Sequence, residues 1–267
     1  MAILTISREY GSGGREIGQA VAGFPGYEYI DKGKILADIS ALGKKWEEWG
    51  KDLDEHCPTI WEKYDWSFRG FSALLQSHLL HYALGDKVVI MGRGGNFLLK
   101  DIPYALRVRV TAPIKTRVER IMKREAVDMD TARWLAEKTD KERSCLIYSI
   151  YGRHWDDPKE YDMVFDTGIL TINEITNILK DALLDKERFR TDKARSILES
   201  RAIAAKIKAG ILTNPNFFIP TLEVHHDGKE FVLRGVIHNP AEHKSIEDAA
   251  KKLAGNIPIR CELHYRL

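Results

Sequence analysis

Short apolar runs alternate with longer amphipathic segments from the start of the chain to about residue 185. The runs are rich in β-branched residues, whereas the segments between them repeat their apolar positions at the spacing of a helix. Strands are therefore expected near residues 3–6, 27–30, 87–91, 106–110 and 163–165. Strands that alternate with helices in this way predict an α/β fold in which helices cover both faces of a parallel sheet.

The amphipathic segments predict the helices of this fold. We expect them after residue 14, from Pro113 onward, and over residues 33–42, 71–84, 129–148 and 169–184. Pro113 suits the first turn of a helix, where a missing N–H costs nothing. An aromatic-rich stretch over residues 44–69 suits broken helices, which form either an insertion over a ligand cleft or a helical cap with buried tryptophans.

The pattern changes from about residue 186, where a heavily charged stretch begins. Beyond it the periodicity predicts a helix over 202–209, strands over 221–224 and 230–236, a helix over 241–253 and a strand over 259–265. The sequence His226-Asp227-Gly228-Lys229 between the first two strands is typical of a hairpin turn. We therefore predict an α/β domain over residues 1–185, a charged linker over 186–200 and a small α+β domain over 201–267.

Composition narrows the classes of protein. The 267 residues suffice for one or two domains, and a net charge of +2 gives no strong field toward nucleic acid or an anionic membrane. No apolar run approaches the roughly 20 residues of a membrane span. Cys57, Cys145 and Cys261 lie far apart without metal-binding spacing, so we expect buried or free thiols of a reducing compartment. The N-terminus enters a strand at once, so the expected location is cytoplasmic.

The stretch ILTISREYGSGGREI, residues 3–17, carries the clearest chemistry. A strand, a glycine turn and a helix in succession are the layout of a phosphate-binding loop. Glycines allow positive φ angles and a close approach of the backbone to an anion, and the helix N-terminus offers unpaired N–H groups. An ordinary glycine-rich turn between a strand and a helix is the alternative interpretation.

The match to the pattern G-x-x-x-x-G-K-[ST] is imperfect. With Gly14 as the second glycine, Arg15 takes the lysine position and Glu16 the hydroxyl position. A shift by one places Gly14 at the lysine. Neither register supplies the Ser or Thr that holds magnesium. Arg15 would lie in the first turn of a helix, which disfavours a cation unless an anion is close, and this favours a phosphate site.

Other polar residues follow the predicted strands. Asp31, Gly92-Arg93 and Asp166 each stand at the carboxyl end of a strand, as residues 7–14 do. Ligands of open parallel sheets bind at these ends. We therefore expect these residues to line one crevice.

Five motifs in order give the first domain a resemblance to the cytidylate kinase-like proteins, which are P-loop nucleoside monophosphate kinases. They are ITISREYGSGGREIG, YIDKGKI, VVIMGRGGNFLL, the DKER segment and YDMVFDTGILT, and the resemblance covers roughly residues 1–185. It implies a three-layer P-loop kinase fold with a five-stranded parallel sheet and a mobile lid. The implied activity is transfer of the γ-phosphoryl group of ATP to a nucleoside monophosphate, with Mg²⁺.

The resemblance also implies roles for individual residues. The ATP phosphates would lie against Gly11, Ser12, Gly13, Gly14, Arg15 and Glu16; the acceptor would meet Asp31 and Arg93; and the catalytic cations would be Arg15, Arg120, Arg124 and Arg143. Arginine grips phosphate oxygens with two parallel hydrogen bonds and stays charged. Since Arg120 and Arg124 are spaced i,i+4, a solvated helix face is their alternative interpretation.

Three departures from the family pattern leave the acceptor open. The loop lacks its lysine, Gly94 stands where an aspartate is usual, and Ala37 stands where an acceptor-site arginine is usual. The leading hypothesis is a kinase for CMP, dCMP or a related acceptor. A nucleotide sensor with little turnover and a kinase for a non-nucleotide acceptor are the alternatives.

The C-terminal segment resembles a BON domain, a type of module usually described as binding or adaptor. It implies a regulatory role and a protein or ligand partner. His225 and His226 are neighbours on a predicted strand and so face opposite ways, which argues against a shared metal. We expect no metal site made by the protein's own side chains.

Overall fold

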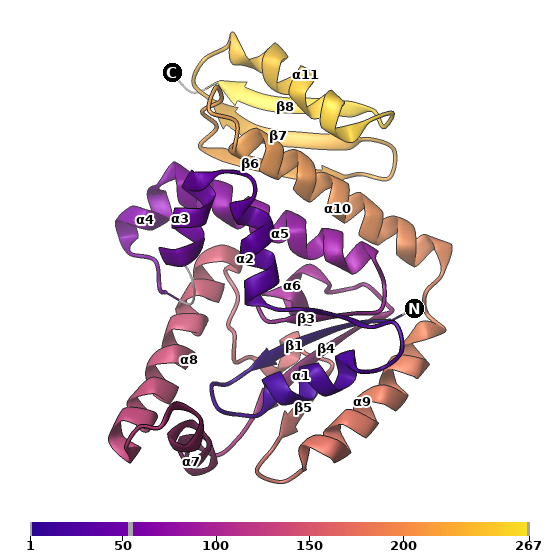
Figure 1. Cartoon of the computed structure of the whole chain (residues 1–267). Helices are drawn as coiled ribbons and strands as arrows, with labels where there is room; N and C mark the ends of the chain where they lie inside the picture. Colours follow the sequence, from indigo (N-terminus) through magenta and orange to yellow (C-terminus); the bar gives the residue numbers. More distant parts are fainter. Residues whose placement is uncertain (1, 53–55, 266–267) are drawn as a thin grey trace. The chain divides into compact units, whose positions relative to one another are not determined.

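The computed structural model describes residues 2–52 and 56–265, and Figure 1 shows its helices and strands. The chain divides into two compact units. The first contains Met1–Thr59 and Gly85–Ala194, and the second contains Ile60–Leu84 and Arg195–Leu267.

A five-stranded parallel sheet forms the centre of the first unit. Its strands are β1 (Ile3–Arg8), β2 (Glu28–Ile30), β3 (Val88–Met91), β4 (Ala105–Thr111) and β5 (Met163–Asp166), in the order β2-β3-β1-β4-β5. All four neighbouring pairs are parallel. Because β1 lies in the middle and is covered on both faces, its first five residues are buried, and all of them except Thr5 and Ser7 are apolar. The predicted α/β class and five-stranded sheet are confirmed.

The helices of the first unit follow the strands where the periodicity predicts them, except for a short helix over residues 95–98 that it does not predict. They are α1 (Gly14–Ala22), α2 (Lys32–Ser40), α3 (Lys44–Asp52), α6 (Gly95–Leu98), α7 (Ile114–Glu125), α8 (Met129–Tyr151) and α9 (Ile172–Glu187), with a short 3-10 turn, η1 (Pro158–Glu160). Pro113 caps the start of α7, as expected.

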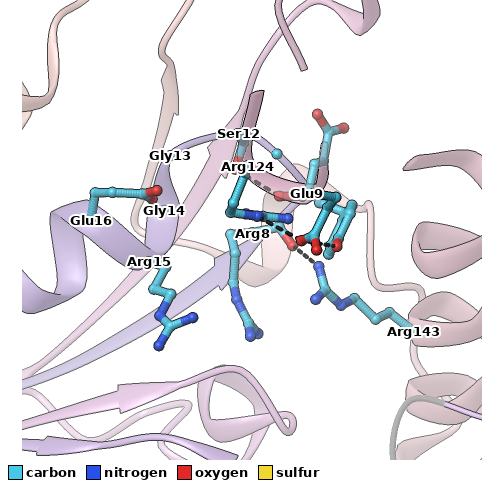
Figure 2. A pocket seen from close by; sticks show the side chains of 12 residues that line it. Arg8, Glu9, Ser12, Gly13, Gly14, Arg15, Glu16, Arg124 and Arg143 are labelled. Atoms are coloured by element: carbon cyan, nitrogen blue, oxygen red, sulfur yellow. Dashed lines mark hydrogen bonds and ion pairs between the residues drawn. The ribbon is translucent and has the colours of Figure 1, made fainter. Parts of the chain in front are cut away.

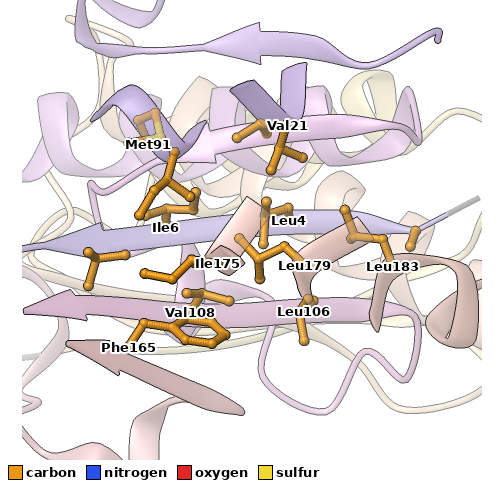
Figure 3. Close-up of a cluster of buried hydrophobic side chains, with 14 residues drawn as sticks. Leu4, Ile6, Val21, Met91, Leu106, Val108, Phe165, Ile175, Leu179 and Leu183 are labelled. Atoms are coloured by element: carbon orange, nitrogen blue, oxygen red, sulfur yellow. The ribbon is translucent and has the colours of Figure 1, made fainter. Parts of the chain in front are cut away.

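The main core lies between the sheet and the pair α1 and α9. Leu4 and Ile6 of β1 point into it, Val21 comes from α1, and Ile175 and Leu179 come from α9 (Figure 3). All five side chains are fully buried. Thr5 alternates to the opposite face, where Gly95 of α6 approaches it. The sheet therefore carries helices on both faces and holds the start of α1 in a fixed place.

Helices α7 and α8 pack against each other beside this core. Val118 and Ile121 of α7 pack against Ala132 and Ala136 of α8 in a small cluster of their own. Asp128 caps α8 through a hydrogen bond from the backbone N–H of Thr131, at 2.9 Å. This helix pair presents its arginines toward the loop that follows β1.

The second unit contains two helices from the middle of the chain and the C-terminal segment. Its elements are α4 (Ile60–Tyr64), α5 (Trp66–Leu84), most of α10 (Asp192–Leu212), β6 (Thr221–His226), β7 (Phe231–Ile237), α11 (Glu242–Ala254) and β8 (Ile259–Tyr265). Strand β7 pairs antiparallel with β6 and parallel with β8. The predicted order of helix, two strands, helix and strand is confirmed.

The division into units differs from the predicted domains. Helices α4 and α5 belong to the second unit, although the sequence places them in the first domain. The predicted charged linker over 186–200 is mostly helical, since α9 ends at Glu187 and α10 begins at Asp192. The boundaries of the independently folding domains stay a prediction.

The expectation of free thiols is wrong for two of the three cysteines. Cys57 and Cys145 form a disulfide, with their Cα atoms 5.2 Å apart. The bond joins the segment after α3 to α8. Cys261 is free, and burial raises its pKa to about 11. Within the described ranges, none of the helices combines the length and the apolar character that crossing a bilayer requires.

Candidate functional site

The loop between β1 and α1 has the backbone geometry of an anion site. Gly11 and Gly13 have φ angles of 80° and 84°, which side chains disfavour. Gly13 is the N-cap of α1 and offers no side-chain cap to the first turn of the helix. The N–H groups at the start of α1 are therefore available to a bound anion, and the helix dipole favours a negative charge there.

A cavity of about 420 Å³ opens beside this loop (Figure 2). Residues 8–16 line it continuously, together with Arg124, Glu125 and Arg143. The predicted loop residues Gly11, Ser12, Gly13, Gly14, Arg15 and Glu16 are thus all brought to one place. In Figure 2, Arg8 and Arg15 extend to the same side of the loop, and Arg143 approaches from α8.

Hydrogen bonds hold the loop in shape on the side of the last strand. The Ser12 hydroxyl donates to the carbonyl oxygen of Glu9 at 2.8 Å. The Thr167 hydroxyl, just after β5, donates to the carbonyl oxygen of Ser12 at 2.6 Å. Arg120 in turn donates from Nη1 to Thr167 Oγ1 at 2.7 Å and from Nη2 to the Thr167 carbonyl at 3.2 Å.

Arg120 therefore occupies a different place from the other predicted cations. It is not among the residues that line the cavity, and its guanidinium supports the loop through Thr167. In this position it can orient the carbonyl of Ser12 but does not face the cavity directly.

The carboxylate of Glu9 is neutralised by residues outside the loop. Its Oε2 accepts a hydrogen bond from the backbone N–H of Ala112 at 3.1 Å and lies 3.5 Å from Arg117 Nε. Its Oε1 lies 3.7 Å from Arg109 Nη2. The backbone N–H of Tyr10 donates to Asp140 Oδ1 at 2.8 Å. These contacts tie the loop to β4, α7 and α8 and offset the negative charge of Glu9.

Arg124 and Arg143 reach the cavity from the helix pair. Arg143 donates from Nη1 to the carbonyl oxygen of Arg8 at 3.1 Å, and its side chain is only 11% exposed. Arg124 lies over the ring of Tyr10 at 4.7 Å and donates to Glu125 Oε1 at 2.9 Å. The hydrogen bonds from Arg124 and Tyr10 lower the pKa of Glu125. Arg143 is fixed, whereas Arg124 is 40% exposed.

A second and smaller cavity, of about 30 Å³, lies against the turn after β3. Arg93, Gly94 and Trp155 contribute to its wall, and Arg8 and Arg143 line both cavities. The expected single crevice is thus two cavities that share two arginines. Arg15 lines only the larger one, and Arg93 lines only the smaller one.

Tyr151 explains why position 94 is a glycine. Its hydroxyl donates to the carbonyl oxygen of Arg93 at 2.7 Å, and burial raises the pKa of this tyrosine. A Cβ atom on Gly94 would lie 2.1 Å from Tyr151 Cε2, far closer than real Cβ contacts. Gly94 also has a φ angle of 76°. The aspartate expected from the family pattern therefore has no room here.

Asp31 lines neither cavity in the structure. It is the N-cap of α2, and its Oδ1 accepts a hydrogen bond from the backbone N–H of Lys34 at 3.2 Å. Aspartate is commonly found in this N-capping role at the start of a helix. Its charge also raises the pKa of the neighbouring Tyr29, after the larger effect of burial.

Arg8 is a site residue to which the sequence assigns no role of its own, although it belongs to residues 7–14, which are expected to line the crevice. It is the last residue of β1, where the pattern indicates only the end of a strand. Its side chain nevertheless lines both cavities, and its positive charge lowers the pKa of Tyr29 against the effect of burial. The signal that could have revealed it is the pair Gly14 and Gly92, because both glycines lie directly against the Arg8 side chain.

Comparison with known proteins places this site in a family context. The model of the cytidylate kinase-like family matches residues 3–169. The chain is 28% identical over 196 residues to the cytidylate kinase of Methanopyrus kandleri, covering 69% of this chain and 96% of that protein. It is 28% identical over 186 residues to the cytidylate kinase of Methanocaldococcus jannaschii, covering 68% and 97%.

A solved structure shares the fold. An uncharacterized protein from Eubacterium ventriosum superposes with a TM-score of 0.54 at 22% identity, covering 68% of this chain and 98% of that one. The matched residues of the family model contain the glycine loop, both cavities and the disulfide.

Proposed function

Because the chain belongs to the cytidylate kinase-like family, we propose that it transfers the γ-phosphoryl group of ATP to a nucleoside monophosphate of the CMP or dCMP type. The observation that carries this proposal is the larger cavity. In it the uncapped start of α1 and a loop with two left-handed glycines face Arg8, Arg15, Arg124 and Arg143.

The loop is suited to hold the phosphates of ATP. Phosphoryl transfer depends on positioning and on neutralising charge more than on covalent help. Backbone N–H groups at the start of α1 would bind the β- and γ-phosphates, as helix N-termini bind anions generally. Arg15 and Arg143 would add charge-assisted hydrogen bonds, which are about twice as strong as neutral ones.

The smaller cavity is suited to the acceptor phosphate. Arg93 lines it together with Arg8 and Arg143. Arginines would therefore lie near both the donor phosphates in the larger cavity and the acceptor phosphate in the smaller one. With Gly94 and Ala37 in place of the family's usual aspartate and arginine, another nucleotide or another small acceptor stays open as the substrate.

The expected Mg²⁺ has no usual protein ligand in the loop. The hydroxyl position holds Arg15 or Glu16, and the Ser12 hydroxyl donates to Glu9. No group of three or more potential metal ligands occurs among the residues that the structure describes. The loop side chains do not fit a resident metal, so no step of the proposed reaction passes through one.

A nucleotide sensor with little turnover is the second candidate. It is favoured by the absence of both the lysine and the magnesium-holding hydroxyl from the loop. In this case the small C-terminal domain, which resembles a BON domain, would pass the nucleotide state to a protein or ligand partner. A regulatory role for this domain and a cytoplasmic location stay predictions under either candidate.

A coupled assay of ADP release over a panel of nucleoside monophosphates tests the proposal. Acceptor-stimulated turnover with CMP or dCMP would support it. Tight ATP binding without stimulation by any monophosphate would favour the sensor, and stimulation by a small non-nucleotide alcohol or phosphate would favour the third hypothesis. Absence of both binding and turnover would contradict all three.

A further inference from the structure

Relative to the phosphate-loop pattern, the cation and a glycine have changed places: Arg8 stands at a glycine position, and Gly14 stands at the lysine position. Gly13 takes a left-handed conformation before α1, whereas Gly14 is already helical, so Gly13 fits the second glycine of G-x-x-x-x-G-K. In this register Gly14 occupies the lysine position. Position 8, six residues before Gly14, corresponds to the first glycine of the pattern but is an arginine in this chain. The loop has thus lost a cation at one end of the pattern and gained one at the other.

The two positions exclude each other's side chains. A Cβ atom on Gly14 would lie 2.5 Å from Arg8 Cβ and 3.1 Å from Arg8 Cγ. A lysine at position 14 therefore requires glycine at position 8, and an arginine at position 8 requires glycine at position 14. Gly14 has no positive φ angle to explain it, so the reason is steric, with Arg8 as the closest neighbour and Val110 Cβ next at 3.3 Å.

The Arg8 side chain reaches the junction of the two cavities. A Cβ atom on Gly92 would lie 2.4 Å from Arg8 Nη1, so the guanidinium lies directly against the turn after β3. The same side chain lines both the cavity of the glycine loop and the cavity of Arg93. A phosphoryl group that moves from a donor in the first to an acceptor in the second must pass this point.

We propose that Arg8 is a catalytic residue that supplies the positive charge which the loop lysine supplies in the usual pattern. This inference rests on the proposed function. In the reaction, an oxygen of the acceptor phosphate forms a bond to the γ-phosphorus, the bond to the β–γ bridging oxygen breaks, and the electron pair leaves with ADP. Arg8 gives up no proton; it neutralises the equatorial oxygens of the group in transit.

Exchange of the two residues provides the test. Three variants are compared with the wild type: Arg8→Gly, Gly14→Lys and the double variant that restores glycine at 8 and lysine at 14. We expect Arg8→Gly to lower kcat/KM for ATP by about 10²–10³-fold, as loss of one charge-stabilising group does elsewhere. Gly14→Lys alone should also lose activity, because Arg8 blocks its side chain. The double variant should recover about tenfold or more over Arg8→Gly.

Calorimetric titration with ATP and a control variant distinguish failure of the proposed function from failure of the role proposed for Arg8. Arg133→Ala, on the exposed surface of α8, should leave kcat/KM unchanged. If the wild type neither binds nor consumes ATP, the proposed function fails and this inference with it. If the wild type is active but Arg8→Gly stays within threefold of it, or the double variant gains nothing over Arg8→Gly, only the assignment of Arg8 fails.

Thermal unfolding without nucleotide tests the steric step separately. Gly14→Ala should lower the melting temperature in the wild-type background, because its Cβ meets Arg8. In the Arg8→Gly background the same change should be neutral or stabilising, since alanine favours a helix more than glycine does. Equal effects of Gly14→Ala in both backgrounds would contradict the claim that Arg8 and a side chain at position 14 exclude each other.

Discussion

At the scale of single residues, Arg15 shows that binding an anion and stabilising the fold can favour different side chains at one position. Arg15 lies exposed in the first turn of α1, where the helix dipole repels a cation. No negative side chain is hydrogen-bonded to it among the contacts that the structure describes. An anion bound at the loop would attract the Arg15 guanidinium and outweigh its repulsion by the helix dipole. Arg15 is therefore better explained by anion binding than by stability of the fold.

Arg15→Ala should therefore separate stability from binding. Removing the cation from the helix start should raise the free energy of unfolding by about 0.3–1 kcal/mol in the absence of ligand. The same change should weaken ATP binding by about tenfold or more, because a charge-assisted hydrogen bond is lost. Chemical denaturation and calorimetry measure the two quantities. Unchanged ATP affinity would remove Arg15 from the site.

Gly94 shows how a neighbour on a distant helix fixes a residue of the site. Gly94→Ala should destabilise the protein by about 2–4 kcal/mol, because it adds both a left-handed alanine and a clash with Tyr151. In a Tyr151→Ala background only the backbone strain should remain, so the additional loss should fall to about 1–2 kcal/mol. A double-mutant cycle by thermal unfolding measures this coupling. Purely additive effects would contradict the clash.

Sequence reasoning reached the residues whose role is set by local backbone geometry. The loop residues from Gly11 to Glu16 do line one cavity, because strand, glycine turn and helix are contiguous in the chain. It included Arg8 in the stretch expected to line the crevice but gave it no role, because the position of its guanidinium depends on Gly92 in the turn after β3. It placed Asp31 at the acceptor, whereas in the structure Asp31 caps α2 and lines neither cavity.

At the scale of elements, α8 connects three parts of the first unit. Through Asp140 and Arg143 it contacts the loop backbone at Tyr10 and Arg8, and through Cys145 it is bonded to Cys57 after α3. The hydrophobic pattern predicted the helix itself within a few residues. It could not predict the disulfide, because 88 residues separate the two cysteines and no spacing motif marks them.

Loss of this disulfide should affect both stability and the site. Cys145→Ser should lower the free energy of unfolding by about 2–4 kcal/mol, as removal of a cross-link that closes a long loop usually does. It should also weaken ATP binding, because α8 positions Arg143. Thermal unfolding with and without a reductant measures the first effect. Cys261→Ser is the matched control and should change neither quantity, since Cys261 is a free thiol outside the site. A melting temperature insensitive to the reductant would contradict a structural role for the bond.

At the scale of the whole molecule, the two units are not two consecutive stretches of sequence. Helix α5 lies between two strands of the first unit along the chain but belongs to the second unit. Eleven of its residues are buried, so apolar positions cover almost its whole circumference. The pattern predicted this helix, but a helix that is apolar all round gives no sign of which unit it completes.

Truncation after Asp185 tests the predicted domain boundary most directly. The Arg195 Nη1 donates to the carbonyl oxygen of Leu84 at 2.6 Å, and the Trp66 ring stacks on Phe218 at 5.0 Å. A chain of residues 1–185 lacks both partners and leaves the buried side chains of α5 exposed, so we expect a lower melting temperature and binding of a hydrophobic dye. The matched control ends after Leu212, which keeps Arg195 and the whole of α10, and its melting temperature should fall less. A chain of 1–185 that unfolds cooperatively at the full-length temperature and binds ATP would instead support residue 185 as the domain boundary.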